Sequence, residues 1–182
     1  MAAFEYLLRF AFDALVTVLV LRVWLQAVQA DFYNPLCQFI VKVTNPMVIP
    51  FRRIIPGFGG IDVATVLIAY VAAAVKFLLI SMMNGGELNV LTIALIGFIF
   101  LIKHVGFLLM IIMLVMALMS WVVQGYNPTI MIFQQLTEPF LRPIRKVVPV
   151  IGGLDLSILV AFLILNFFNI LLSGWIPYWA WL

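Results

Sequence analysis

Charged residues are scarce in this sequence. Asp, Glu, Lys and Arg together make up 9% of the 182 residues, whereas a soluble domain carries about a quarter. Hydrophobic residues make up 66%, and the mean hydropathy is +1.25. A chain with so few charges cannot cover a surface that faces water, so we expect a lipid bilayer to surround it.

Cysteine and histidine each occur once, as Cys37 and His104. A single cysteine excludes a disulfide within the chain, and a single histidine excludes a multi-histidine metal centre or a bis-histidine haem. The sequence also lacks a phosphate-binding glycine loop and any nucleic-acid-binding motif. We therefore expect no metal, no other cofactor, no nucleic-acid partner and no catalytic residue, and we predict that the chain is not an enzyme.

The sequence does contain a repeated motif. Residues 45–62, NPMVIPFRRIIPGFGGID, align without a gap with residues 138–155, EPFLRPIRKVVPVIGGLD. The identities concentrate in residue types that set backbone shape and charge, whereas chance similarity between apolar stretches would match Leu and Val. We interpret the pattern as an internal duplication, with a first repeat at 1–87 and a second at 88–182. The structural motif positions are Pro46, Pro50, Pro56, Gly59, Gly60 and Asp62, matched by Pro139, Pro143, Pro149, Gly152, Gly153 and Asp155.

Three apolar runs are long enough to cross a bilayer, which takes about 20 residues. We expect spanning helices over about 8–28, 63–83 and 156–175. The first run could be mistaken for a secretory signal, but its counterpart in the second repeat cannot be one. We therefore expect it to be retained as a span.

A fourth apolar region covers residues 88–123. As one helix it would be roughly 54 Å long at about 1.5 Å per residue, which exceeds the roughly 30 Å of the hydrocarbon core. Gly97, Gly106 and the Lys103-His104 pair suggest a break. Either both pieces span the membrane, or the first lies in the interface and only the second spans.

Positive charge favours the second alternative. Six of the ten Lys and Arg residues lie in the two motif loops. If only one piece spans, both loops face the same side, as expected for cytoplasmic loops. We predict an all-α membrane protein with four transmembrane helices in two parallel helix–loop–helix repeats, both motif loops being cytoplasmic. Residues 88–103 would be interfacial or re-entrant.

Each motif loop begins with a helix-start signal, Asn34-Pro35 in the first copy and Asn127-Pro128 in the second. Asparagine suits the N-cap and proline suits the first helical position. Apolar residues then recur at helical spacing, which predicts a short amphipathic helix in the interface. We expect the internal prolines to stop these helices. The Asp that closes each motif directly precedes an apolar run, where it can cap the next helix.

Basic residues follow these amphipathic helices. At the interface, their charged heads could meet lipid phosphates while their stems remain among the acyl chains. We predict that they bind anionic lipid or an acidic partner. Two other uses stay open, namely fold and lipid anchoring alone, or contact between an Arg of one copy and an Asp of the other. The candidate binding residues are Arg52, Arg53, Arg142, Arg145 and Lys146.

Charged residues within the apolar runs are candidates for function, because an unpaired charge in the bilayer is costly. Asp13 and Lys76 fall at comparable depth on antiparallel helices, so we predict that they pair, either to join helices or as part of an ion pathway. Arg22 is expected to snorkel toward the cytoplasmic side. Asn166 and Asn169 suit interhelical hydrogen bonds better than cation coordination.

The two copies together resemble the YggT (YlmG-like) family of bacterial integral membrane proteins. The resemblance rests on NPLCQFIVKVTNPMVIPFRRIIPGFGGID, on YNPTIMIFQQLTEPFLRPIRKVVPVIGGLD and on the core P-x-R-[RK]-x-x-P-x-x-G-G-x-D, which occurs twice. It covers essentially the whole chain. The second copy departs from the first in having Glu138 where the first has Asn45, and in an additional Arg142.

The resemblance implies a multi-pass protein of the bacterial inner (plasma) membrane, linked to osmotic stress tolerance, cation homeostasis or envelope organisation. Relatives in plastids are associated with cytochrome assembly. The resemblance provides no catalytic residue. Our leading hypothesis is a membrane organiser or assembly factor that binds anionic lipids, with a membrane-protein partner or homo-oligomer as a further association. The alternative is a K⁺ or Na⁺ channel or transporter, or its subunit, in osmotic homeostasis.

Overall fold

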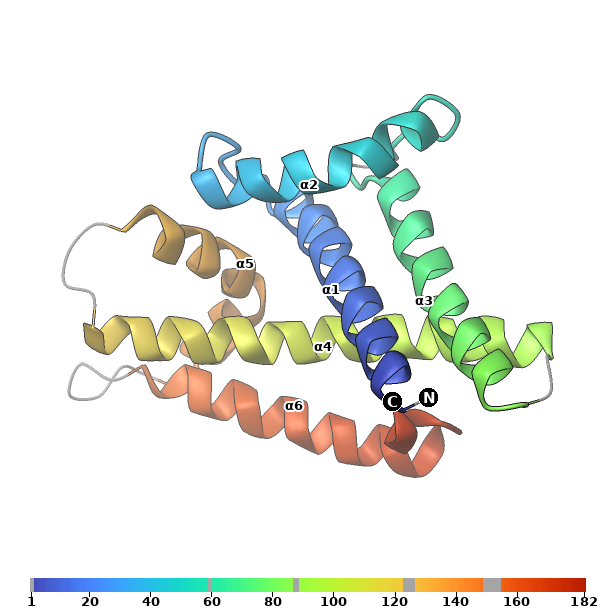
Figure 1. The fold of residues 1–182 in the computed structure, drawn as a ribbon. Coiled ribbons are helices and arrows are strands. Elements are labelled where there is room, and N and C mark those ends of the chain that lie inside the picture. Colours follow the sequence, from blue (N-terminus) through green and yellow to red (C-terminus); the bar gives the residue numbers. More distant parts are fainter. Residues whose placement is uncertain (1, 59, 87–88, 123–126, 149–154) are drawn as a thin grey trace. The chain divides into compact units, whose positions relative to one another are not determined.

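The computed structural model describes residues 2–58, 60–86, 89–122, 127–148 and 155–182. The described residues form no named strand, and the predicted all-α class is confirmed (Figure 1). The chain divides into two compact units, Met1–Val105 and Gly106–Leu182. The helices are α1 (Ala2–Ala27), α2 (Pro35–Arg52), α3 (Val63–Met83), α4 (Val90–Val122), α5 (Pro128–Arg145), α6 (Leu156–Trp175) and the short 3-10 helix η1 (Trp179–Trp181).

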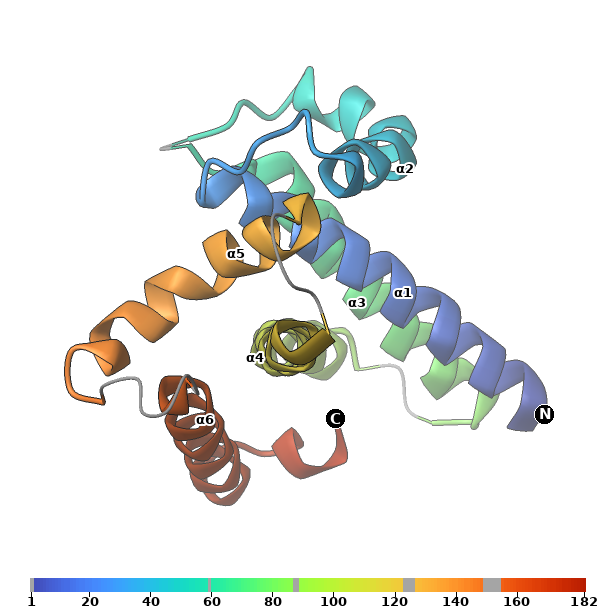
Figure 2. The same cartoon turned by 90° about the vertical axis from the view of Figure 1, so that its left-hand side faces the viewer.

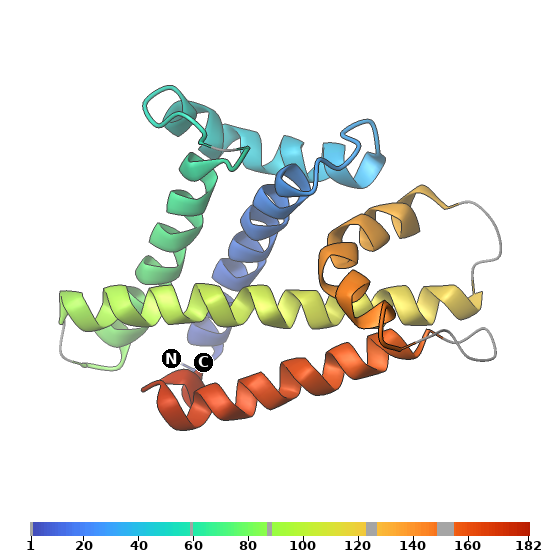
Figure 3. The same ribbon diagram turned by 180° about the vertical axis from the view of Figure 1, so that it is seen from behind.

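In the first unit, α1 and α3 lie side by side and α2 lies across their ends (Figures 1 and 3). Figure 2 shows α2 nearly along its axis above the other two helices. Leu19, Val48, Ile68 and Ala69 form the buried cluster where the three helices meet. Small residues on α3 allow α1 to approach closely, and the buried ones are Ala64, Ala69, Ala72 and Ala73. The apolar face of α2 thus closes one end of the helix pair.

Three helices are long and apolar enough to cross a membrane. They are α3, α6 and the part of α4 from Val90 to Met119. The chain is therefore a membrane protein by helix length and composition. α1, which carries four charged residues among its apolar ones, is not among the three. The fourth span stays a prediction.

α4 is one continuous helix of 33 residues, so the predicted break is wrong. A glycine destabilises a helix by only about 1 kcal/mol relative to alanine. Gly97 and His104 of α4 instead lie where this helix contacts other helices. A Cβ on Gly97 would lie 3.1 Å from the Ala74 backbone of α3. The His104 Nε2 atom lies 2.8 Å from the hydroxyl of Thr17 on α1. The first half of α4 therefore belongs to the first unit.

The internal prolines do not stop α2 and α5, contrary to prediction. Each helix continues through two prolines, to Arg52 in α2 and to Arg145 in α5. Proline removes the hydrogen bond to the carbonyl four residues earlier. These carbonyls belong to exposed residues here, so polar surroundings can replace the missing donor. The four prolines are Pro46, Pro50, Pro139 and Pro143.

In the first motif, a tight turn follows α2 and leads into α3. Phe58 and Ile61 exchange two backbone hydrogen bonds of 3.1 and 3.0 Å. Gly60 has a φ of +82°, a conformation that glycine adopts without steric cost. Pro56 precedes this turn and is exposed. The motif residues Gly59, Pro149, Gly152 and Gly153 lie outside the described residues.

In the second unit, α5 packs against α6. The Thr137 hydroxyl on α5 donates to the Phe133 carbonyl at 2.8 Å and lies 3.6 Å from the Met116 sulfur of α4. Leu136 and Leu141 are fully buried on the same helix. At least one face of α5 is therefore covered by other helices of its unit.

Candidate functional site

The basic motif is positioned by two helices of equal length. α2 and α5 each have 18 residues and begin at a proline that follows an asparagine N-cap. The Asn34 side chain accepts from the Leu36 N–H at 2.9 Å, and the Asn127 side chain accepts from the Thr129 N–H at 2.9 Å. These N-caps confirm the helix starts predicted from the sequence. The last turn of each helix carries basic residues, namely Arg52 in α2 and Arg142 and Arg145 in α5.

In the first half, Arg52 joins the end of α2 to the start of α3. Its Nε and Nη2 atoms donate to Asp62 Oδ2 at 2.9 and 2.5 Å. Asp62 is the N-cap of α3, as predicted, and its side chain accepts from the Thr65 N–H and hydroxyl. The carboxylate is 2% exposed. We call the group formed by Arg52, Asp62 and Arg22 the first clamp; the contacts of Arg22 are described next.

Arg22 of α1 is part of the first clamp, and its guanidinium group is buried against α2. It is 4% exposed. Its Nη1 atom donates to Thr44 Oγ1 at 2.5 Å and to Asn45 Oδ1 at 2.9 Å. Its Nε atom lies 3.8 Å from Asp62 Oδ2. The sequence carried one signal for this contact, namely an arginine near the end of an apolar run. A charge in such a run is costly when unpaired, so a partner was to be expected.

The second clamp joins α5 to α6 with the matching pair of residues. Arg145 Nε and Nη2 donate to Asp155 Oδ2 at 3.0 and 2.8 Å. Asp155 is the predicted N-cap of α6 and accepts from the Ser157 N–H at 3.0 Å. Arg145 Nη1 also donates to Glu138 Oε2 at 2.6 Å. These Arg–Asp contacts therefore form within each copy of the motif, whereas contact between the copies was one of the alternatives left open by the sequence.

The two clamps carry opposite net charge. The first contains the guanidinium groups of Arg22 and Arg52 and one carboxylate. The second contains one guanidinium group and the carboxylates of Asp155 and Glu138. In the motif alignment, Asn45 takes the place of Glu138, and the counterpart of Arg22 is Val115. The first clamp therefore has one cation in excess, and the second has one anion in excess.

Both N-cap aspartates have a lowered pKa. Burial raises the pKa of the Asp62 carboxyl, but hydrogen bonds from Arg52 and Thr65 outweigh burial, so the pKa falls below its usual value. Burial acts in the same direction on Asp155, and hydrogen bonds from Ser157 and Arg145 again produce a net lowering of its pKa. Both carboxylates are therefore charged at neutral pH.

The clamps divide the five predicted binding residues into two groups. Arg52 and Arg145 are held by carboxylates. Arg53, Arg142 and Lys146 are exposed, and no carboxylate pairs with them among the described residues. Arg53 and Lys146 are the C-caps of α2 and α5 and have the same backbone angles, φ −69° and ψ −25°. These three side chains are available to a ligand.

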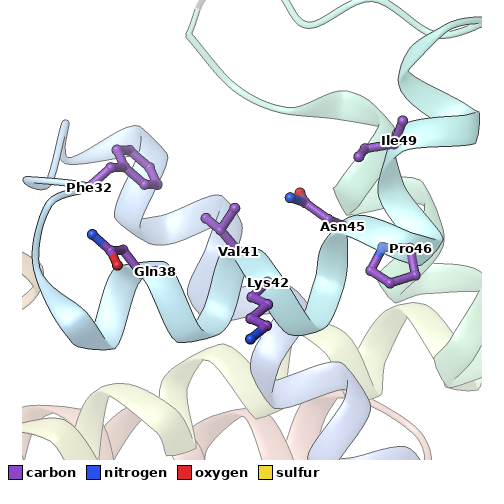
Figure 4. Close-up of a pocket in the computed structure, with 7 residues that line it drawn as sticks. All are labelled: Phe32, Gln38, Val41, Lys42, Asn45, Pro46 and Ile49. Atoms are coloured by element: carbon purple, nitrogen blue, oxygen red, sulfur yellow. The ribbon is translucent and has the colours of Figure 1, made fainter.

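A shallow groove runs along α2 (Figure 4). Its volume is about 490 Å³. We call it the α2 groove; its lining consists of Phe32, Gln38, Val41, Lys42, Asn45, Pro46 and Ile49. A second groove of about 430 Å³ shares Phe32, Val41 and Asn45 with the first and also includes Arg22, Gln26 and Arg52. We call the second one the arginine groove. Together they connect an apolar surface with the cations of the first clamp.

The structure brings Asp13 and Lys76 together. Lys76 Nζ donates to Asp13 Oδ1 at 2.5 Å and lies 4.0 Å from the centre of the Phe100 ring. The Lys76 side chain is 5% exposed and that of Asp13 is 40% exposed. The Thr17 hydroxyl, which bonds His104, donates to the Asp13 carbonyl at 2.7 Å. The lysine thus has both an anion and an aromatic face as partners.

The asparagines of α6 are engaged in local hydrogen bonds. Asn166 donates to the Phe162 carbonyl at 3.1 Å, and Asn169 accepts from the Trp179 indole at 2.8 Å. Within the described part of the chain, no three His, Cys, Asp or Glu side chains are grouped closely enough to hold a metal ion. The polar groups of α6 thus bind the helix itself and the η1 segment.

Comparison with known proteins places these features in a family. The model of the CCB3/YggT family matches residues 1–83 and 95–176. The chain is 47% identical over 182 residues to a protein of the proC 3′ region in Vibrio alginolyticus, covering 98% of each chain. It is 41% identical to YggT of Escherichia coli K12, over 93% of this chain and 88% of the relative. It is 42% identical to PA0392 of Pseudomonas aeruginosa, over 91% and 86% respectively. No solved structure matches the chain.

Proposed function

The chain belongs to the CCB3/YggT family, and from this premise we propose that it is a non-enzymatic organiser or assembly factor of the bacterial inner membrane. Its relatives named above come from bacteria. The proposed binding surface consists of the exposed cations Arg53, Arg142 and Lys146. Their ligand is the anionic headgroup surface, with a membrane-protein partner or a second copy as a further association. The resemblance links this role to osmotic stress tolerance.

The observation that supports the proposal is that neighbouring basic residues in each motif have different surroundings. Arg52 and Arg145 neutralise the N-cap aspartates and hold the ends of amphipathic helices against apolar helices. The next residue in each case, Arg53 or Lys146, is exposed. A clamp that fixes the backbone therefore presents a cation beside it. Each such cation near an anionic membrane surface contributes about 1 kcal/mol of attraction.

The proposed topology has four spans, with α1 as the first. Lys76 lies about 21 Å along α3 from its N-cap, and Asp13 lies about 21 Å along α1 from its last residue, at about 1.5 Å per residue. The ion pair between them therefore requires similar depth on two antiparallel helices. α2 lies across the ends of α1 and α3, which suits an interfacial helix. Both clamps would face the cytoplasm.

Charge reversal tests the proposal. The triple variant Arg53→Glu, Arg142→Glu and Lys146→Glu should have fewer contacts with anionic lipid than the unmodified protein when both are reconstituted in vesicles. Cells with this variant should grow less after osmotic upshift. Arg9→Glu, near the other end of α1, is the matched control. In-cell photo-crosslinking from Phe51 and Ile144 identifies whether a protein or only lipid is adjacent. Unchanged lipid contact, partner adducts and stress tolerance in the triple variant would show that the proposal is wrong.

A cation channel or transporter is the second candidate, resting on Asp13, Lys76, Asn166 and Asn169. The observed contacts favour it less. Lys76 and Asp13 neutralise each other, and the two asparagines already have hydrogen-bond partners. K⁺ and Na⁺ flux in proteoliposomes, with and without an osmotic gradient, tests this function directly. Flux that Asp13→Asn abolishes would replace the organiser proposal.

A further inference from the structure

The first clamp has an unused binding capacity for an anion. Arg22 and Arg52 share a single carboxylate, Asp62. Among the described residues, neither Arg52 Nη1 nor Arg22 Nη2 makes a hydrogen bond. Both arginines line the arginine groove. Two guanidinium groups that line one groove suit a phosphate or carboxylate oxygen, which accepts charge-assisted hydrogen bonds.

The second half of the chain contains an anion at the corresponding position. Glu138 Oε2 accepts from Arg145 Nη1 at 2.6 Å. In the motif alignment, Glu138 corresponds to Asn45 and Arg145 corresponds to Arg52. The Nη1 atom that is occupied by an internal carboxylate in the second clamp is thus without an acceptor in the first. The chain itself provides a comparison between a filled site and an open one.

The surroundings of the open site favour a phospholipid as the anion's source. The arginine groove shares Phe32, Val41 and Asn45 with the α2 groove, whose lining adds apolar Ile49 and the exposed cation Lys42 (Figure 4). The site lies at the N-terminal end of α3, one of the helices able to cross a membrane. This end of a span is the level of the lipid headgroups. Guanidinium groups meet the phosphate there, and apolar side chains meet the glycerol and acyl region.

We propose that the first half of the chain holds the phosphate of one anionic phospholipid between Arg22 and Arg52, with Asn45 as a further donor. The second half, with Glu138 on Arg145 and Val115 in place of Arg22, holds none. The inference rests on the proposed lipid-binding function and assigns it a specific site. It also predicts asymmetry, with one bound lipid per chain. The exposed cations of the proposed function contribute general attraction, whereas this site contributes selectivity.

Two reciprocal substitutions test the site. Asn45→Glu places in the first clamp the carboxylate that the second clamp already tolerates, so the variant should fold. It should weaken binding of short-chain phosphatidylglycerol to the purified full-length protein by about tenfold, since a charge-assisted contact of this kind contributes about 1.5 kcal/mol or more. Glu138→Asn frees one side of Arg145 but leaves it paired with Asp155 and with Val115 in place of Arg22, so this variant should still bind only one lipid tightly. Native mass spectrometry in detergent counts these lipids.

The titrants separate the sources of phosphate. Short-chain phosphatidylcholine of the same acyl length should bind more weakly, because its headgroup has no net charge to match the excess cation. Inorganic phosphate at equal concentration should not displace phosphatidylglycerol, and displacement would overturn the assignment to lipid. Unaltered phosphatidylglycerol binding in Asn45→Glu would overturn the site. If charge reversal of the exposed cations still reduced contact with anionic lipid in that case, the proposed function would stand without this inference.

Discussion

Replacing Asp62 by asparagine should destabilise the protein much more than the matching change of Asp155. Asparagine is a good N-cap, so Asp62→Asn keeps an acceptor for the Thr65 N–H at the start of α3. It removes the charge and replaces the oxygen that accepts from Arg52 by an amide donor. It leaves Arg22, whose side chain is 5% exposed, beside Arg52 without an anion. Removing one partner of a buried ion pair costs about 3 kcal/mol at the lower end of the usual range, and the 41% exposure of Arg52 favours that lower end.

Asp155→Asn is the internal control. Arg145 keeps Glu138 as a partner, and both of these side chains are substantially exposed. Exposed ion pairs contribute about 1 kcal/mol or less, so we expect a cost of about 1 kcal/mol for this variant. The difference between the two variants should therefore be about 2 kcal/mol, the excess of the buried pair over the exposed one.

Unfolding by a denaturing detergent, followed by helical circular dichroism, measures both free energies. A double-mutant cycle with Arg52→Gln isolates the coupling. Because Arg52→Gln also relieves repulsion from Arg22, Asp62→Asn and Arg52→Gln together should cost less than the sum of the single changes. Equal costs for Asp62→Asn and Asp155→Asn, or additive costs in the cycle, would refute the reasoning that the first clamp carries an excess of buried positive charge.

Three further outcomes follow from the same contacts. Because the folded pKa of Asp62 is lowered, the stability that this carboxylate contributes is fully present above its unfolded pKa of about 4 and is lost as pH falls through the folded pKa. Thermal unfolding scans at decreasing pH should show this loss of stability. In Asp62→Asn, the contribution of Asp62 to the acid loss should be absent. Gly97→Ala should lower the melting temperature, because the new Cβ would lie 3.1 Å from the Ala74 backbone, whereas Gly106→Ala, with no neighbour within 4 Å, should raise it by removing glycine from a helix. Cys37 is fully buried, and burial raises the pKa of its thiol. Maleimide labelling of the native protein should therefore be slow and should become fast on unfolding. Equal labelling rates in both states would contradict the packing of α2.

The helix class and the helix starts were predictable because they depend on local chemistry. Asn34 and Asn127 each precede a proline, and Asp62 precedes an apolar run, so N-cap preference and hydropathy act on adjacent residues. Comparable depth also predicted Asp13 as the partner of Lys76, since rise per residue fixes how far a side chain lies along a helix.

The predicted ends of α2 at its prolines and the predicted break in α4 were wrong, because exposure decided the first and tertiary contacts decided the second. Pro46 and Pro50 lose hydrogen bonds on an exposed side, where the loss is tolerated. Gly97 and His104 were interpreted as interruptions, although they are positions where α4 contacts α3 and α1. The role of Arg22 could not be found from spacing, because its partners Thr44 and Asn45 come from another helix.

The length of α4 has a consequence for the membrane around it. A helix of 33 residues is about 50 Å long. If the whole helix crossed a bilayer at a tilt of about 40°, at the upper end of the observed range, it would extend about 38 Å along the bilayer normal, and the hydrocarbon core is about 30 Å thick. This surplus would be a positive hydrophobic mismatch, which costs a fraction of a kcal/mol per Å. For α4 as a span, we therefore expect an orientation that depends on lipid acyl-chain length, so that a change in bilayer thickness alone would exert a torque on this helix.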